Sequence, residues 1–180
     1  LETNPDTLIA DLAGRARAAA GALAQMPTEA KAKALRSAAQ AMRDAQGDIL
    51  KANDADMEAA RERGLTGALL DRLKLDDKRF EAIAGLDDPV GQVIDRSTPA
   101  NGLELTRVRV PIGVIGIIYE SRPNVTADAG ALCVMAGNAA ILRGGSEAAQ
   151  SNRAILKALR AGLEAAGAPA DAVQLVPTQE

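Results

Sequence analysis

Two continuous apolar runs in the second half of the chain restrict its fold more than any other feature. Residues 113–118 (GVIGII) and 139–142 (AAIL) have the length and unbroken apolar character of strands buried on both faces. Helical spacing separates them, and a long helical pattern over residues 146–167 leads to a third apolar run, AVQLV. Strand–helix–strand–helix–strand at this spacing predicts an α/β fold, with a parallel sheet, right-handed crossovers and helices on both faces.

Polar residues gather where the first two predicted strands end. YESRPN occupies residues 119–124 after the first strand, and RGGS occupies residues 143–146 after the second. Ligands of open parallel sheets bind at the carboxyl ends of the strands, so this edge is the predicted binding site. The following helix is expected to begin at Ser146 as its cap, with free N–H groups that favour an anion.

The region before the sheet is expected to be helical. Apolar residues at helical spacing predict a first helix that ends before Pro27, and Thr28 is the expected cap of a second. A polar restart at Asn53–Asp54 is expected to begin a third helix, with Gly64 as its stop. These patterns predict a helical region in front of the α/β part.

A change of period marks the segment between the helices and the sheet. RSTPANG, residues 96–102, has the composition of a turn, and the alternating residues 103–110 predict an edge strand with cations on one side. No partner for this strand is evident in the sequence. A partner outside the chain would leave an open strand edge.

Composition excludes several classes of function. The 180 residues hold 21 Lys and Arg against 24 Asp and Glu, so the basic surface of a nucleic-acid-binding protein is not expected. Histidine is absent, which removes histidine-based catalysis and zinc sites, and no metal is expected. A single cysteine allows no internal disulfide and fits a cytoplasmic protein, and no apolar run is long enough to span a membrane.

One long block of the sequence is similar to a known enzyme family. RVRVPIGVIGIIYESRPNVTADAGALCVMAGNAAILRGGSEA resembles the glutamate-5-semialdehyde dehydrogenases, or γ-glutamyl phosphate reductases, of the aldehyde dehydrogenase superfamily. ILKANDADMEAARERGLTGALLDRLKL and DPVGQVID extend the resemblance over nearly the whole chain. It implies NADPH-dependent reduction of γ-glutamyl phosphate to the semialdehyde in proline biosynthesis, through a cysteine nucleophile in a homo-oligomer.

The resemblance also implies a division of the chain. Residues 1–94 are expected to be the N-terminal helices of the cofactor-binding domain, 95–110 a strand segment of the oligomerisation sheet, and 111–180 the βαβαβ part of the NADP-binding domain. The catalytic domain, which carries the nucleophilic cysteine in the family, is expected to be absent from this chain. Between Arg79 and Pro89 the family has a longer helical stretch than this sequence provides.

The residues that face the substrate are assigned through the resemblance. Asn124 resembles the strand-end asparagine whose amide holds the substrate oxygen as it becomes an oxyanion. The alternative for Asn124 is a turn residue that caps the next helix. Arg122 keeps its charge and is suited to bind a carboxylate or acyl phosphate bidentately, or equally to form a surface ion pair.

The residues that face the cofactor follow the same two strand ends. Arg143 matches the basic residue that holds the adenosine ribose, and Gly144 and Gly145 allow close backbone approach. Ser146 stands where many NAD-preferring relatives carry a glutamate, which favours NADP(H). The alternative is an ordinary left-handed turn and helix cap. Tyr119 and Glu120 are also assigned to the cofactor, with a simple loop acid as the alternative for Glu120.

Cys133 is rejected as the nucleophile. It lies within an apolar helical pattern, with no histidine in the chain and no neighbouring cation to lower its pKa. Two other functions stay open. One is an aldehyde dehydrogenase for a different acyl substrate, and the other is a stand-alone nucleotide-binding or assembly module without catalysis.

Overall fold

A computed structural model describes residues 4–65, 67, 70, 73, 85–120 and 122–177. Three helices come first: α1 (Pro5–Gln25), α2 (Thr28–Asp44) and α3 (Gln46–Glu62). Two strands follow, β1 (Val93–Ser97) and β2 (Leu105–Val108). The remaining elements are β3 (Val114–Ile118), α6 (Asn124–Met135), β4 (Ala139–Arg143), a 3-10 turn (Ser146–Ala148), α7 (Ala149–Ala165), a second 3-10 turn (Ala170–Ala172) and β5 (Val173–Leu175).

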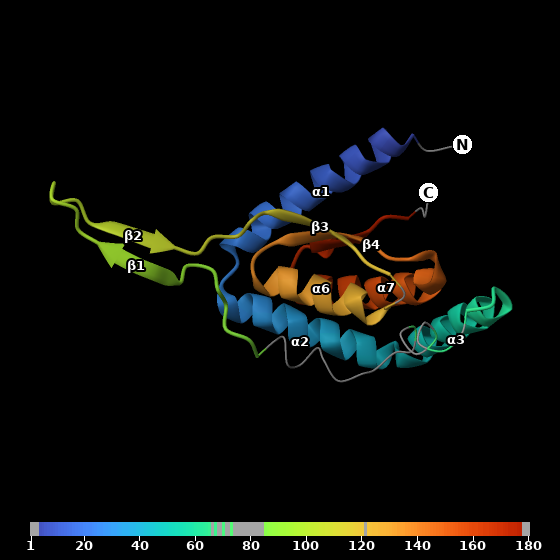
Figure 1. Ribbon diagram of the computed structural model, residues 1–180. Helices are drawn as coiled ribbons and strands as arrows, with labels where there is room; N and C mark the ends of the chain where they lie inside the picture. The colour runs from blue at the N-terminus through green and yellow to red at the C-terminus, as the bar shows by residue number, and fades with distance from the viewer. Residues whose placement is uncertain are drawn as a thin grey trace.

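The parallel sheet predicted from the apolar runs is confirmed. Its strands lie in the order β3-β4-β5, and both pairs are parallel. Helix α1 covers one face, while α6 and α7 cover the other, with α2 and α3 packed outside them (Figure 1). The sheet therefore has helices on both faces, and β4, its central strand, is mostly buried between them. The prediction that β3 is also buried on both faces is wrong, because this edge strand has only half-buried and exposed residues and Ile118 is 76% exposed.

Small side chains allow these layers to pack closely. Alanine and leucine dominate the fully buried positions, and the chain has a single phenylalanine and a single tyrosine. The main core cluster includes Ala16, Ala19 and Leu23 of α1, Leu35 and Ala38 of α2, Val134 of α6, Leu142 of β4, and Leu159 and Leu163 of α7.

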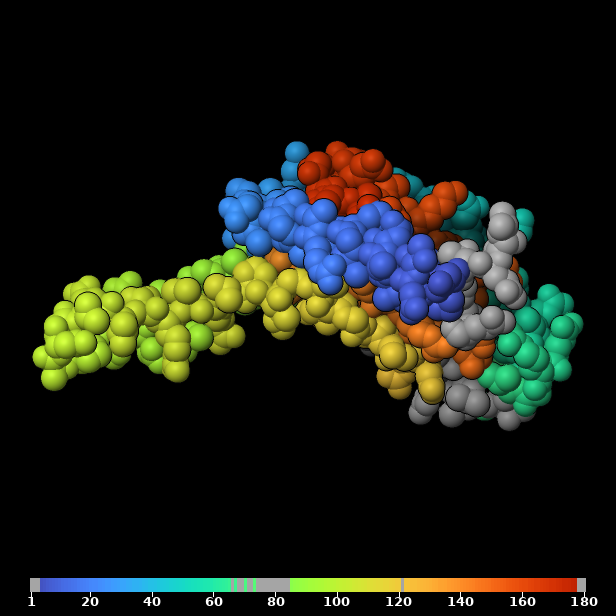
Figure 2. Space-filling view, turned by 90° about the horizontal axis from the view of Figure 1, so that it is seen from above, coloured from blue at the N-terminus to red at the C-terminus, as the bar shows by residue number. Residues whose placement is uncertain are grey.

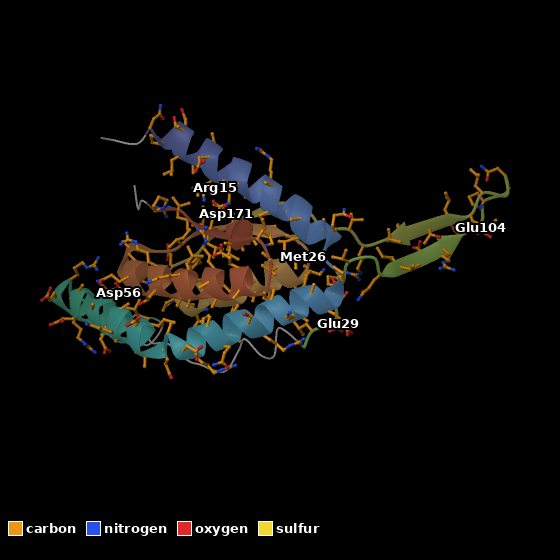
Figure 3. All side chains as sticks on the ribbon, turned by 180° about the vertical axis from the view of Figure 1, so that it is seen from behind. Arg15, Met26, Glu29, Asp56, Glu104 and Asp171 are labelled. Atoms are coloured by element: carbon orange, nitrogen blue, oxygen red, sulfur yellow. The ribbon has the colours of Figure 1, made fainter. Side chains whose placement is uncertain are left out.

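A half-buried carboxylate ties α1 to the rest of the protein. Asp171, in the second 3-10 turn, accepts hydrogen bonds from Arg15 of α1 at 2.9 Å and from Arg160 of α7 at 2.8 Å. Arg15 and Asp171 point toward one another across the gap between α1 and the layer below (Figure 3). Gln174 of β5 adds a bond to the Leu12 carbonyl of α1 at 3.1 Å. These contacts fix α1 on its face of the sheet.

The helix boundaries differ from two of the sequence predictions. Thr28 does not cap α2, because it is the first helical residue and its hydroxyl donates to the Asp88 carboxylate at 2.8 Å. The expected restart at Asn53–Asp54 is also wrong, since α3 runs unbroken from Gln46 to Glu62. Asn53 is buried within this helix and bonds to other elements, so its polarity marks a tertiary contact rather than a helix start.

The strand predicted over residues 103–110 has its partner within the chain. β1 and β2 pair antiparallel, with Asp95 opposite Arg107 and Ser97 opposite Leu105. Arg96 and Ser97 belong to β1, so the RSTPANG turn is shorter than predicted. The turn ends at Gly102, whose φ of 79° is the left-handed conformation that glycine adopts without strain.

This hairpin projects from the body of the protein (Figures 1 and 2). Every residue of β1 and β2 is exposed, including four large apolar ones: Val93, Ile94, Leu105 and Val108. The segment between Arg79 and Pro89, expected to be shorter here than in the family, falls partly on residues 79–84, which lie outside the described residues.

Candidate functional site

The two polar loops meet at one edge of the sheet. β3 and β4 pair in register up to Ile118 and Arg143, the last residues of the two strands. Beyond them, the Tyr119 N–H donates to the Arg143 carbonyl oxygen at 3.0 Å. The segment after Tyr119 and the segment after Arg143 therefore leave the sheet at the same edge, as predicted, while ligand binding at this edge stays a prediction.

The residues assigned to the substrate lie on the first loop. Glu120 and Arg122 are exposed, Pro123 is buried, and Asn124 is half-buried at the first position of α6. The alternative of a turn at the helix start is borne out in part, because Pro123 lies in a turn at the N-cap position and Asn124 is the first helical residue, but no side chain caps the helix. The Asn124 amide is thus not used by the helix, and its role as an oxyanion donor stays a prediction. Ser121, between Glu120 and Arg122, lies outside the described residues.

Tyr119 turns its hydroxyl toward the interior instead of the loop surface. The hydroxyl lies 2.6 Å from Oγ1 of Thr126 in α6, and the Thr126 hydroxyl donates to Oδ1 of Asn152 in α7 at 2.9 Å. Burial raises the pKa of Tyr119, and the bond with Thr126 offsets only part of this effect. Tyr119 therefore keeps its proton at neutral pH and links β3 to both helices.

The glycine loop follows β4 without a left-handed residue. Gly145 has φ −66° and ψ 156°, and Gly144 is not among the glycines with positive φ. The alternative of an ordinary left-handed turn is therefore wrong. Gly144 is closely approached by side chains: an added Cβ would lie 2.2 Å from Nδ2 of Asn152 and 3.1 Å from the Tyr119 hydroxyl, so Asn152 would have to move.

The start of the next helix differs from the prediction. Ser146 is exposed, begins the 3-10 turn Ser146–Ala148 and makes no capping bond, so it is not the cap of α7. The start of α7 is instead capped by Asp56, which belongs to α3 and lies beside this end of the helix (Figure 3). Its carboxylate accepts from the backbone N–H of Gln150 at 3.2 Å and of Ser151 at 2.7 Å.

The Asp56 carboxylate adds a negative charge at the amino end of α7. A carboxylate at the amino end of α7 stabilises the helix dipole and uses two of the N–H groups that an anion would need. Asp56 also accepts from the Ser151 hydroxyl at 2.7 Å, and Asn53 donates to that hydroxyl at 3.1 Å. Two of the N–H groups that were expected to favour an anion, those of Gln150 and Ser151, are therefore already occupied by Asp56.

Cys133 lies within α6 and is buried. Burial raises the pKa of its thiol, so the nucleophilic thiolate is disfavoured. Its rejection as a nucleophile agrees with this environment. In the described part of the chain, no three acidic or cysteine side chains form a group suited to a metal ion. None of the described helices combines the length and apolar composition needed to cross a membrane.

Four buried polar residues of this region were not predicted from the sequence: Asp56, Thr126, Ser151 and Asn152. A weak signal existed for Asn152. It lies one turn before Ile155 and two turns before Leu159, on the buried face of α7, where Ser151 is the other polar residue. A polar residue on an apolar helical face indicates a buried hydrogen bond, but the sequence does not name its partner.

The sequence profile of the aldehyde dehydrogenase family matches residues 6–180. The chain belongs to this family. A γ-glutamyl phosphate reductase of Sphingopyxis alaskensis is 63% identical over 180 aligned positions, which cover 96% of this chain and 42% of the relative. The γ-glutamyl phosphate reductase of Zymomonas mobilis is 54% identical, over 99% of this chain and 44% of the relative. The resemblance noted in the sequence is thereby confirmed.

Solved structures lead to the same family. The γ-glutamyl phosphate reductase of Thermotoga maritima matches with a TM-score of 0.88 and 43% identity, over 96% of this chain and 43% of that one. The γ-glutamyl phosphate reductase of Saccharomyces cerevisiae matches with a TM-score of 0.87 and 34% identity, over 94% of this chain and 46% of that one. The chain spans less than half the length of these relatives. A propionaldehyde dehydrogenase of Rhodopseudomonas palustris, 18% identical with a TM-score of 0.67 over 96% of this chain and 38% of that one, shares the fold.

Proposed function

We propose that this chain is the cofactor-binding part of a γ-glutamyl phosphate reductase. The proposed reaction is the NADPH-dependent reduction of L-glutamate 5-phosphate to L-glutamate 5-semialdehyde in proline biosynthesis, in the cytoplasm. The observation that carries the proposal is the 63% identity, over 96% of the chain, to a relative of that name. The two loops that meet at the carboxyl edge of the sheet supply a suitable place for the cofactor and the acyl group.

The second loop fits the nucleotide end of NADP(H). Gly144 has no side chain to block it, and Arg143 brings a permanent positive charge to the end of β4. In this proposal Arg143, Gly144, Gly145 and Ser146 hold the adenosine ribose and its 2′-phosphate. The Asp56 carboxylate occupies the start of α7, so the phosphate is placed on the loop.

The first loop serves the reacting end of the substrate. Exposed Arg122 binds a carboxylate or phosphate of glutamyl phosphate, and Glu120 contacts the cofactor ribose. Asn124 donates its amide N–H to the carbonyl oxygen as negative charge develops there, which stabilises the transition state without binding an ionic ground state. When bound, NADPH supplies the hydride.

The attacking thiolate is not provided by Cys133 in this proposal. Cys133 is the single cysteine of the 180 residues, and it is buried. A full-length protein that carries this chain should therefore oxidise L-glutamate 5-semialdehyde with NADP⁺ and phosphate, while the 180 residues alone should not turn over. Turnover by the 180 residues would contradict the exclusion of Cys133.

Cofactor preference is tested at Ser146. A Ser146→Glu substitution places a carboxylate beside the proposed 2′-phosphate, so it should weaken NADPH binding about tenfold more than NADH binding, a difference of about 1.4 kcal/mol. Fluorescence titration with both cofactors measures the ratio. Equal losses for the two cofactors would remove the argument for NADP(H).

The second candidate is a stand-alone nucleotide-binding or assembly module. It is favoured by the buried state of the one cysteine, which leaves these residues without a nucleophile. The native mass of the cellular protein separates the two candidates. A mass near 18.5 kDa supports the module, and a much larger mass with a further cysteine supports the reductase.

We also propose that the reductase is a homo-oligomer that uses the β1–β2 hairpin. A two-stranded ribbon is marginally stable alone in water, and this one exposes Ile94 and Leu105, each about half accessible. Burial against a second copy would remove apolar surface from water and supply neighbouring strands. Light scattering of the full-length protein and an Ile94→Lys variant should give a larger mass for the unsubstituted protein; equal masses would contradict this part.

A further inference from the structure

Thr126 and Asn152 form a buried polar contact directly beneath the two loops. Their exposed fractions are 0% and 1%, so their polar groups need partners inside the protein, and the Thr126–Asn152 hydrogen bond is one of them. Thr126 lies in the first turn of α6, just after the YESRPN loop, and Asn152 lies in the first turn of α7, just after the RGGS loop. Each side chain therefore comes from the helix that one of the loops leads into.

The direction of the hydrogen bonds follows from what each group can donate. The Thr126 hydroxyl has one proton, and it donates to Oδ1 of Asn152, which can only accept. The Tyr119 hydroxyl, 2.6 Å away, must therefore donate to the Thr126 oxygen. The chain Tyr119 to Thr126 to Asn152 is directional and fixes the side-chain amide of Asn152 in one orientation.

That orientation brings the Asn152 amide against Gly144. A Cβ on Gly144 would be 2.2 Å from Nδ2 and 3.2 Å from Cγ of Asn152. Tyr119, at the other end of the hydrogen-bond chain, is joined to Arg143 through its backbone N–H. Tyr119 thus contacts Arg143 and Asn152 contacts Gly144, the two residues with which the second loop begins.

We propose that Thr126 and Asn152 are positioning residues that set the conformation of the loop Arg143–Ser146 for the nucleotide. This inference rests on the proposed cofactor site and adds two residues that act through the loop rather than by contact with the cofactor. The inference also changes the role of Tyr119, which was expected to contact the cofactor. Its hydroxyl is used in the network, so Tyr119 supports the loop from below.

The test compares matched variants in the full-length protein. Thr126→Val keeps the shape of the side chain and removes its hydroxyl, while Thr126→Ser restores the hydroxyl. Asn152→Ala removes the amide next to Gly144. The control is Asn138→Ala, because Asn138 is also buried and makes two hydrogen bonds, to the Gly113 N–H at 2.8 Å and the Ala136 carbonyl at 3.1 Å, but at the opposite end of β4.

Two measurements are made on each variant: hydrogen exchange of the backbone amides of residues 143–148, and NADPH affinity by fluorescence titration. Thr126→Val and Asn152→Ala should raise exchange in this loop and raise the Kd about tenfold, as expected for loss of one buried hydrogen bond. Thr126→Ser should restore both values. Asn138→Ala should leave loop exchange and Kd unchanged even where it lowers global stability.

The outcomes separate this inference from the proposed function. Equal effects of the Asn152 and Asn138 substitutions on loop exchange and on Kd would overturn the positioning role, as would unchanged loop exchange in Thr126→Val. If the unsubstituted protein does not bind NADPH, the proposed cofactor site fails. The exchange comparison would still decide whether Thr126 and Asn152 hold the loop.

Discussion

Replacing Gly162 of α7 by alanine should destabilise the protein, although helix propensity alone predicts the opposite. Alanine in a helix interior is favoured over glycine by about 1 kcal/mol. In this structure, however, a Cβ at Gly162 would lie 2.4 Å from Cα of Ala38 and 2.7 Å from both the Ala38 nitrogen and the Ser37 oxygen. These are backbone atoms of α2, so no side-chain rotation relieves the contact.

The size of the effect follows from the distances. Carbon atoms in contact are about 3.5–4.0 Å apart, so α2 and α7 must separate by roughly 1 Å at this point. Separation loosens the packing of fully buried Leu35, Ala38 and Leu159 on both sides of the contact. Overpacking of this kind costs up to about 3 kcal/mol, and after the gain in propensity a net loss of about 2 kcal/mol is expected.

Gly21 of α1 provides the matched control. It is also inside a helix, it is exposed, and no described atom lies within 4 Å of the position of its Cβ. Gly21→Ala should therefore raise stability by about 0.5–1 kcal/mol. Urea unfolding followed by circular dichroism measures both, and thermal unfolding should show a Tm about 4–8 °C lower for Gly162→Ala. If Gly162→Ala is as stable as Gly21→Ala, the close approach of the helices is refuted.

Three further predictions concern buried ionisable groups. Lys31, 1% exposed, pairs with Asp88 at 2.6 Å, so Lys31→Met should cost about 3 kcal/mol in urea unfolding, against less than about 0.5 for exposed Lys33→Met. Burial alone would raise the pKa of Asp88, but hydrogen bonds from Lys31, the Val90 N–H and Thr28 lower it below its ordinary value. Asp88 thus stabilises the fold above about pH 4, and this contribution is lost as pH falls through the lowered pKa. Unfolding free energies from pH 6 to 2 should fall less steeply for Asp88→Asn, and parallel curves would contradict this. Cys133 should react with iodoacetamide at least about tenfold more slowly in the folded chain than in urea, because burial disfavours its thiolate; equal rates would mean an accessible thiol.

Local patterns in the sequence were sufficient for much of the fold. The unbroken apolar runs that became β3 and β4 predicted strands, and the helices between the strands require parallel pairing. Burial on both faces was correct for most of β4 but wrong for β3, whose residues are half-buried or exposed. Because parallel strands have their carboxyl ends at the same edge of the sheet, the loops of residues 119–124 and 143–146 were predicted to lie at one edge. The family and its proposed cofactor also followed from residues that are contiguous in sequence.

Contacts between distant segments could not be obtained in this way. Asp56 caps α7 from a helix about 95 residues earlier, and this contact overturned the prediction that Ser146 caps its own helix. Arg96 and Ser97 looked like turn residues because their strand is defined by its partner β2. A helix end accepts any carboxylate that reaches its N–H groups, and a strand exists only when another strand pairs with it.

The sequence by itself determined the order of the elements in the sheet region, the edge that carries the proposed site and the exclusion of histidine chemistry. The tertiary structure alone decided how the site is held. Thr126 and Asn152 are ordinary helical positions in the sequence, and they become a network with Tyr119 only when α6 and α7 pack side by side beneath the loops. The physical reason is that hydrophobic spacing repeats along the chain and can be read locally, whereas a buried hydrogen bond needs a specific partner that folding brings into place.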